Sequence, residues 1–161
     1  MNGERVHVKI GEIKVARETG TLFTVGLGSC VAVALYDPKE RVGGLAHVML
    51  PERANANVHT PGRTAPTAIP ELIRVMEAAG AQRSGIFARI VGGAAMFEGV
   101  LPAYGMKLGT RNVDAVKQAL SDAEIPLRAE DVGGTFGRSV FFDAADGKLL
   151  VRAVKRDDII L

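Results

Sequence analysis

Residues 24–50 read TVGLGSCVAVALYDPKERVGGLAHVML, and this stretch decides the fold. It holds two apolar runs of strand length, 31–36 and 42–50, separated by the sequence Asp-Pro-Lys-Glu at 37–40. Aspartate followed by proline is typical of a type I turn. The stretch therefore predicts a β-hairpin over residues 30–50, with a glycine-punctuated turn before it.

The hairpin brings the single cysteine of the chain close to a histidine. If Tyr36 pairs with Arg41, Cys30 lies directly opposite His47, with Cβ atoms about 4.5 to 5.5 Å apart. If Asp37 pairs with Val42 instead, the two residues are diagonal neighbours on the same face. Only a slip by one residue would place them on opposite faces of the sheet. Two of the registers considered therefore predict a Cys30–His47 pair.

Such a pair is suited to nucleophilic catalysis. A free thiol has a pKa near 8.5, and an imidazolium beside it lowers that pKa, which populates the thiolate. Gly26 and Gly28 allow backbone N–H groups to approach a substrate carbonyl, as an oxyanion hole requires, and Ser29 is a further candidate in the same turn. Thr24, on the preceding strand, is placed to orient the imidazole.

Each of these residues also has a purely structural interpretation. A lone cysteine at the start of a strand is more often a small buried apolar residue, and a histidine in an apolar strand is more often a core residue. His7 and His59 lack the spacing of a metal site, so no metal is expected. The Gly-Leu-Gly-Ser segment lacks both the third glycine of a dinucleotide fingerprint and the lysine of a phosphate-binding loop.

The rest of the chain predicts short strands and two helices. Thr67 is expected to cap a helix that tolerates Pro70 in its first turn and ends at Gly80. A second helix is expected to begin near Asn112, while residues 52–63 resemble an exposed loop. The two helices among eight or nine strands indicate an α+β fold. The other expected strands are residues 6–10, 13–15, 21–25, 86–91, 127–132, 139–143 and 149–154.

Composition restricts the class of protein. The 161 residues favour one domain spanning 1–161, and 47% hydrophobic with 24% charged residues is an ordinary globular balance. A net charge of +2, without a basic block, argues against nucleic-acid binding. One cysteine excludes an intramolecular disulfide. With no apolar run long enough to span a bilayer and no secretory signal, a cytoplasmic protein that does not insert into membranes is expected.

Five motifs in order resemble the CheD family of chemoreceptor glutamine deamidases. They are TVGLGSCVAVALYDP, GGLAHVMLP, GGAAMF, the Gly-x-Arg-Asn of residues 109–112, and AEDVGGTFGR. The resemblance extends over nearly the whole chain. It implies a single-domain α+β sandwich of packed mixed sheets flanked by two or three helices, similar to the cytotoxic necrotizing factor deamidases.

The resemblance also implies a reaction and partners. The family's cysteine nucleophile falls on Cys30, its histidine on His47 and its threonine on Thr24, and no cofactor is implied. Such an enzyme converts chosen glutamines of bacterial chemoreceptors to glutamate. Its partners would be the cytoplasmic helices of chemoreceptors and the CheC phosphatase. Met96 and Phe97, apolar residues in a glycine-bracketed segment, are candidates for the partner contact.

Two segments depart from the family pattern, and two other functions compete with deamidation. Many relatives carry Lys/Arg-Tyr-Ala-Asp where this chain has Arg63-Thr64-Ala65-Pro66, and Lys107 and Thr110 replace residues of the commoner NIGERN form. The competing functions are a non-catalytic module that binds CheC and receptors, and a receptor methylesterase that uses the same thiol.

Overall fold

The computed structural model describes residues 3–52, 60–96 and 105–161. Its strands form two five-stranded sheets, in the orders β1-β3-β8-β9-β10 and β2-β5-β4-β6-β7. The strands are β1 (Arg5–His7), β2 (Ile13–Arg17), β3 (Thr21–Leu27), β4 (Val31–Asp37), β5 (Val42–Val48), β6 (Phe87–Gly92), β7 (Leu127–Val132), β8 (Arg138–Asp143), β9 (Leu149–Arg152) and β10 (Ile159–Ile160). Each sheet contains one parallel pair, β1 with β3 or β6 with β7, so both are mixed and the expected α+β class is confirmed.

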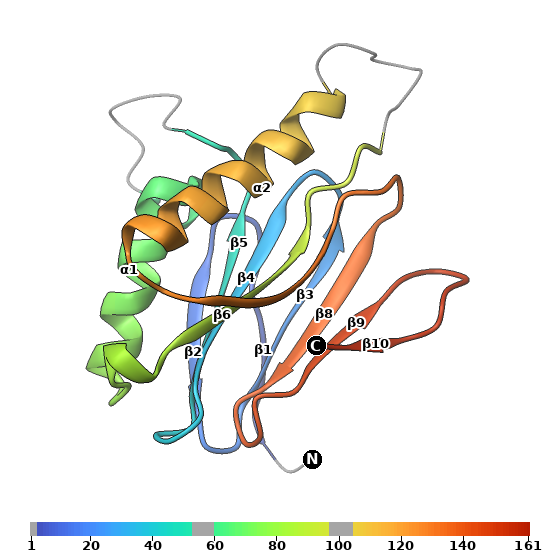
Figure 1. The fold of residues 1–161 in the computed structure, drawn as a ribbon. Helices are drawn as coiled ribbons and strands as arrows, with labels where there is room; N and C mark the ends of the chain where they lie inside the picture. Colours follow the sequence, from blue (N-terminus) through green and yellow to red (C-terminus); the bar gives the residue numbers. More distant parts are fainter. Residues whose placement is uncertain (1–2, 53–59, 97–104) are drawn as a thin grey trace.

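The layers are stacked as helices, sheet, sheet. Helices α1 (Ala65–Ala78) and α2 (Gly105–Asp122) cover one face of the β2-β5-β4-β6-β7 sheet, and the other sheet packs on its opposite face (Figure 1). Two short 3-10 helices, Pro61–Arg63 and Arg83–Gly85, precede α1 and β6. No helix in the described part of the chain is long and apolar enough to cross a membrane.

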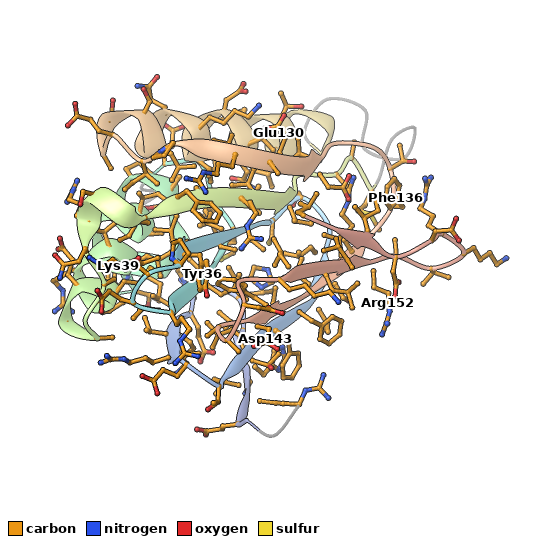
Figure 2. The ribbon with its side chains drawn as sticks, turned by 60° about the horizontal axis from the view of Figure 1, so that its bottom comes forward. Tyr36, Lys39, Glu130, Phe136, Asp143 and Arg152 are labelled. Carbon is orange, nitrogen blue, oxygen red and sulfur yellow. The ribbon has the colours of Figure 1, made fainter. Side chains whose placement is uncertain are left out.

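Strand β4 is buried along its whole length, because both of its faces are covered. Val31, Val33 and Leu35 face the helices. Ala32, Ala34 and Tyr36 face the second sheet. This double burial explains the continuous apolar run in the sequence, since no position faces water. Figure 2 shows Tyr36 among the interior side chains; its hydroxyl donates to the carbonyl of Ala144 at 3.0 Å.

The predicted β4–β5 hairpin is present, in the second of the two registers considered. Asp37 lies opposite Val42, so the pairing of Tyr36 with Arg41 is wrong by two residues. The reason is the side chain of Asp37, whose Oδ1 accepts from the backbone N–H groups of Lys39 and Glu40 at 3.1 and 3.4 Å. This Asx-type turn makes Asp37 the last strand residue, and Arg41 turns the chain with φ of 50°.

Both helices begin earlier than the sequence predicts. Thr64, not Thr67, occupies the N-cap position of α1, and Pro66 lies in the first turn, where its missing N–H costs nothing. Helix α2 begins at Gly105, seven residues before the expected start at Asn112. Glycine has a low helix propensity, but Gly109 serves close packing: a Cβ there would lie 2.5 Å from the carbonyl oxygen of Gly93.

Strand boundaries differ mainly at the chain's ends. Strand β1 ends at His7 rather than residue 10, because the chain turns at residues 9–12, where Glu12 accepts from the Lys9 N–H at 2.9 Å. Strand β9 ends at Arg152, and the two-residue β10 was not predicted. Strand β7, at Leu127–Val132, matches its prediction.

Gly92 allows the backbone after β6 to pass directly over Cys30. Its φ is +119°, and a Cβ would lie 2.2 Å from the carbonyl oxygen of Cys30. That carbonyl accepts the Gly93 N–H at 2.8 Å. A side chain at residue 92 would therefore meet both backbone strain and a backbone atom.

We expect Gly92→Ala to lower the free energy of unfolding by about 3 kcal/mol, because strain and steric overlap add. Gly133→Ala is the matched control: Gly133 also has positive φ, +82°, but no atom lies within 4 Å of the position that a Cβ there would take. The control should lose only about 1 kcal/mol in a urea titration. Equal losses of unfolding free energy in the two variants would show that the overlap with the Cys30 carbonyl adds nothing to the cost of Gly92→Ala.

Candidate active site

Cys30 lies in the turn between β3 and β4, at the end of the sandwich where β6 also ends. It is half-buried and packs against the core between the two sheets. Because it is two residues before Ala32, which faces the same core, its side chain points to the same side of the sheet.

His47 lies on β5 directly opposite Ala32, so it is a diagonal neighbour of Cys30 on the same face. Such neighbours are about 7–8 Å apart at the backbone, within reach of a histidine ring. The predicted same-face relation of Cys30 and His47 is therefore confirmed, although the directly opposed arrangement is not. Their catalytic roles stay predictions.

Thr24 holds the imidazole of His47 from the other sheet. Its Oγ1 lies 2.8 Å from Nδ1 of His47, and both side chains are buried. The Nε2 atom of His47 is also buried and has no hydrogen-bond partner among the described residues. The expected Thr24–His47 contact is present, and the second ring nitrogen is left available for another proton donor or acceptor.

Burial favours the neutral forms of both candidate catalytic groups. Desolvation raises the pKa of the Cys30 thiol, partly opposed by the residue's own backbone N–H. Desolvation lowers the pKa of His47, partly opposed by a backbone contact with Val8. Both directions run against the expectation of a thiolate populated by a neighbouring imidazolium, because the argument from proximity left out the cost of burying charge.

The turn before Cys30 is held in place by hydrogen bonds to the carbonyl groups of Gly28 and Ser29. The carbonyl of Gly28 accepts the Ala94 N–H at 2.8 Å, and that of Ser29 accepts Nδ2 of Asn112 at 2.9 Å. Gly26, the other expected contributor, lies in the irregular part of β3 and is exposed. Asn112 belongs to the Gly-x-Arg-Asn motif. The sequence did not predict its contact with the turn before Cys30, because Asn112 was expected only as the start of a helix.

Met96 lies beside this turn. Its side chain is 43% exposed, and its Cγ is 3.0 Å from where a Cβ on Gly28 would lie. Its Cε approaches Gly137 at the start of β8. Phe97, the other residue expected to contact a partner, lies outside the described residues.

The departure at residues 63–66 lies next to the strand that carries His47. The carbonyl of Arg63 accepts the N–H groups of Met49 and Leu50, both at 3.0 Å. Thr64 and Ala65 are buried at the start of α1. The segment therefore supports the end of β5 through its backbone. In the second segment that departs from the family pattern, Thr110 is exposed on α2.

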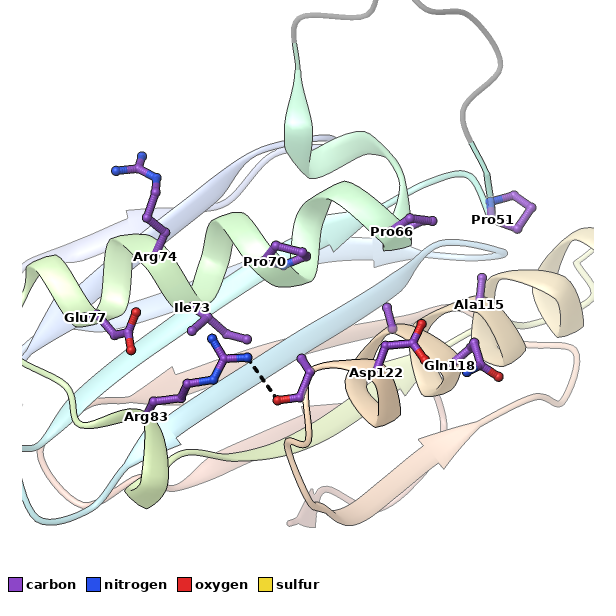
Figure 3. Close-up of a pocket in the computed structure, with 12 residues that line it drawn as sticks. Pro51, Pro66, Pro70, Ile73, Arg74, Glu77, Arg83, Ala115, Gln118 and Asp122 are labelled. Atoms are coloured by element: carbon purple, nitrogen blue, oxygen red, sulfur yellow. Dashed lines mark hydrogen bonds between the residues drawn. The ribbon is translucent and has the colours of Figure 1, made fainter.

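A groove of about 590 Å³ lies between α1 and α2, and none of Thr24, Cys30 and His47 lines it (Figure 3). Pro66, Pro70 and Ile73 line one side, and Ala115 and Ala119 the other. Its lining contains no cysteine, histidine or threonine among the described residues, so it offers none of the groups that a thiol-dependent reaction uses.

The fold and the site together define a class. An α+β sandwich that gathers a cysteine, a histidine and a threonine at one end has the groups of a thiol-dependent acyl-transfer site. Residues 49–153 match the family model described as CheD chemotactic sensory transduction. The chain belongs to the CheD family.

Curated relatives agree along almost the full length. Proteins named "Probable chemoreceptor glutamine deamidase CheD" from Clostridium botulinum strains Hall and Okra are each 41% identical to this chain over 155 residues, covering 96% of both chains. Among solved structures, the hypothetical protein YfiH of Bacillus licheniformis matches 83% of this chain and 61% of its own, with 14% identity and a TM-score of 0.47.

The buried, neutral His47 predicts a pH dependence of stability. Because its pKa is lowered in the folded state, the unfolded chain takes up a proton near pH 6.5 while the folded protein does not. The stabilisation is present above about pH 6.5 and is lost as the pH falls towards the folded pKa. We expect His47→Asn to reduce this loss, measured by urea denaturation at about pH 8 and about pH 5. An unchanged slope in His47→Asn would contradict the assignment.

Proposed function

We propose that this chain, acting as one domain, deamidates glutamine side chains on the cytoplasmic helices of bacterial chemoreceptors, converting them to glutamate in chemotaxis. Membership of the CheD family and the names of its relatives support the reaction. The observation that carries the proposal is the buried imidazole of His47, held at Nδ1 by Thr24, with Nε2 unpaired among the described residues on the face that Cys30 shares. No cofactor takes part in the proposed reaction.

In the proposed mechanism, His47 acts first as a general base. Its Nδ1–H donates to the hydroxyl oxygen of Thr24, which leaves the lone pair of Nε2 free to accept a proton. As Sγ of Cys30 attacks the side-chain carboxamide carbon of the substrate, Nε2 takes the thiol proton. Because burial keeps both groups neutral at rest, proton transfer accompanies attack rather than preceding it.

The attack moves an electron pair onto the carboxamide oxygen. The backbone N–H groups of Ser29 and Cys30 are the donors that we assign to this oxyanion. The His47 imidazolium then protonates the departing nitrogen, ammonia leaves, and a thioester to Cys30 remains. His47 next takes a proton from water, which attacks the thioester. The carbon–sulfur bond breaks, glutamate is released, and the thiol is restored.

Met96 is proposed to contact the receptor helix. It is an exposed apolar side chain beside the turn that carries Cys30, and exposed apolar area in such a place favours a binding role. The same surface is proposed to contact a CheC-type phosphatase, a partner that the family resemblance implies.

The reaction can be tested directly on a purified receptor cytoplasmic fragment. We expect wild-type protein to convert specific glutamines to glutamate, detected by peptide mass spectrometry and by release of ammonia. Cys30→Ala should lower the rate at least about 1,000-fold, and His47→Ala about 100- to 10,000-fold. Gln118→Ala should remain as active as wild type, since Gln118 is exposed on α2 and lines the groove that contains none of Thr24, Cys30 and His47.

The same assay separates the competing functions. A non-catalytic module would bind the fragment without changing its mass, and Cys30→Ala would behave as wild type throughout. A methylesterase would release methanol from a methylated fragment and leave glutamine intact. Either result would contradict the proposed deamidation.

For the proposed receptor contact, we expect Met96→Glu to raise the KM for the receptor fragment about 10-fold, because a charge would be desolvated at the interface. The kcat and the melting temperature should change little, since the side chain is 43% exposed. Val154→Glu is the control, because Val154 is 86% exposed in the β9–β10 loop. An unchanged KM in Met96→Glu would remove this residue from the interface.

A further inference from the structure

Asn112 connects α2 to the two strands that carry the candidate catalytic residues. It lies in the interior of the helix and is 0% exposed. Its Nδ2 donates to the carbonyl of Ser29 at 2.9 Å and to that of Met49 at 3.1 Å. Ser29 immediately precedes Cys30, and Met49 follows His47 by two residues. One amide group therefore holds the nucleophile's turn and the histidine's strand together.

The chemistry of the contact requires an amide. Both bonds use the NH2 group, while Oδ1 is buried with no partner among the described residues. A flipped amide would place Oδ1 against two carbonyl oxygens, which also only accept, so this orientation is the favourable one. An aspartate at this position would give the same repulsion. The close packing of α2 at Gly109 on the carbonyl of Gly93 brings Asn112 within reach.

The bond to Ser29 also fixes the direction of the Cys30 N–H. In a trans peptide the carbonyl and the N–H of the next residue lie in one plane and point in opposite directions. Holding the Ser29 carbonyl towards Asn112 therefore turns the Cys30 N–H away from α2. In the same way, the bond from Ala94 to the Gly28 carbonyl fixes the N–H of Ser29.

The N–H groups of Ser29 and Cys30 are available to donate to a substrate. Within residues 3–52, 60–96 and 105–161, no backbone or side-chain acceptor takes a hydrogen bond from Ser29 N–H or from the Cys30 N–H, apart from the contact of the latter with its own thiol. Backbone donors that lie beside a nucleophile and have no acceptor other than the nucleophile itself are the arrangement of an oxyanion hole.

We propose that Asn112 is a positioning residue, which orients the Cys30 N–H towards the oxyanion formed during attack and keeps the turn aligned with His47. The inference rests on the proposed thiol chemistry and deepens it. Asn112 does not touch the substrate; it acts through the Ser29–Cys30 peptide and through the carbonyl of Met49.

Two small reagents separate this role from a merely structural one. Acylation of Cys30 by p-nitrophenyl acetate passes through an oxyanion, whereas alkylation by iodoacetamide does not. Because Cys30 is the single cysteine, alkylation reports on this residue alone. We expect Asn112→Asp and Asn112→Ala to slow acylation about 100-fold, the cost of losing one oxyanion donor, with alkylation within about threefold of wild type. The control is Gln118→Ala, which removes an exposed amide from the same helix and should change neither rate.

Three results would overturn the proposal. Unchanged acylation in both Asn112 variants would show that the amide does not act through the oxyanion. A parallel fall in acylation, alkylation and melting temperature would show a structural role only. No acylation of the wild-type protein would remove the oxyanion hole itself. If wild type is acylated and the variants are selectively impaired, but wild type leaves the receptor fragment unchanged, Asn112 keeps its role and the proposed substrate is wrong.

Discussion

Burial of β4 on both faces is the constraint on which the other layers depend. Val33 and Leu35 form part of the core beneath the helices, and Ala34 and Tyr36 part of the core between the sheets. Any rotation of this strand would expose apolar side chains on both faces at once, at about 25 cal/mol for each Å² uncovered. The strand's first residue, Val31, therefore faces the helices, and Cys30, just before it, points to the opposite side, towards the core between the sheets.

Burial also sets the electrostatics of the site. A charged thiolate–imidazolium pair would need solvation that the core between the sheets does not provide, and the directions of both pKa shifts reflect this. A neutral pair has a different advantage in the proposed mechanism: the nucleophilic thiolate of Cys30 forms only when a substrate carboxamide is in place. Such a site depends on correctly oriented hydrogen-bond donors and acceptors more than on a permanent ion pair. Thr24 and Asn112 matter for this reason, because they orient the imidazole of His47 and the turn before Cys30.

Much of this arrangement could be predicted from local sequence patterns. The two apolar runs around Asp37-Pro38 predicted the hairpin, and a two-residue error in its register left Cys30 and His47 on one face because side chains alternate with a period of two. Asn112 could not be assigned in this way. Its partners, Ser29 and Met49, are more than 60 residues away, and only the packing of α2 on the sheet brings them together. The early start of α2 was missed for a related reason. Glycine has a low helix propensity, and Gly109 lies in the helix because its lack of a side chain allows close packing on Gly93.

The bond between Thr24 and His47 joins residues of different sheets, and this has a consequence for biosynthesis. Strand β3, which carries Thr24, pairs with β8 at residues 138–143, near the end of the chain. During translation the cysteine and the histidine leave the ribosome long before the strand that secures their threonine has its partner. A nascent or partly folded chain therefore has a thiol but no oriented base. On the proposed mechanism, reactivity of Cys30 towards carboxamides would arise only when the two sheets dock, so the incomplete chain would not deamidate its neighbours or its own glutamines.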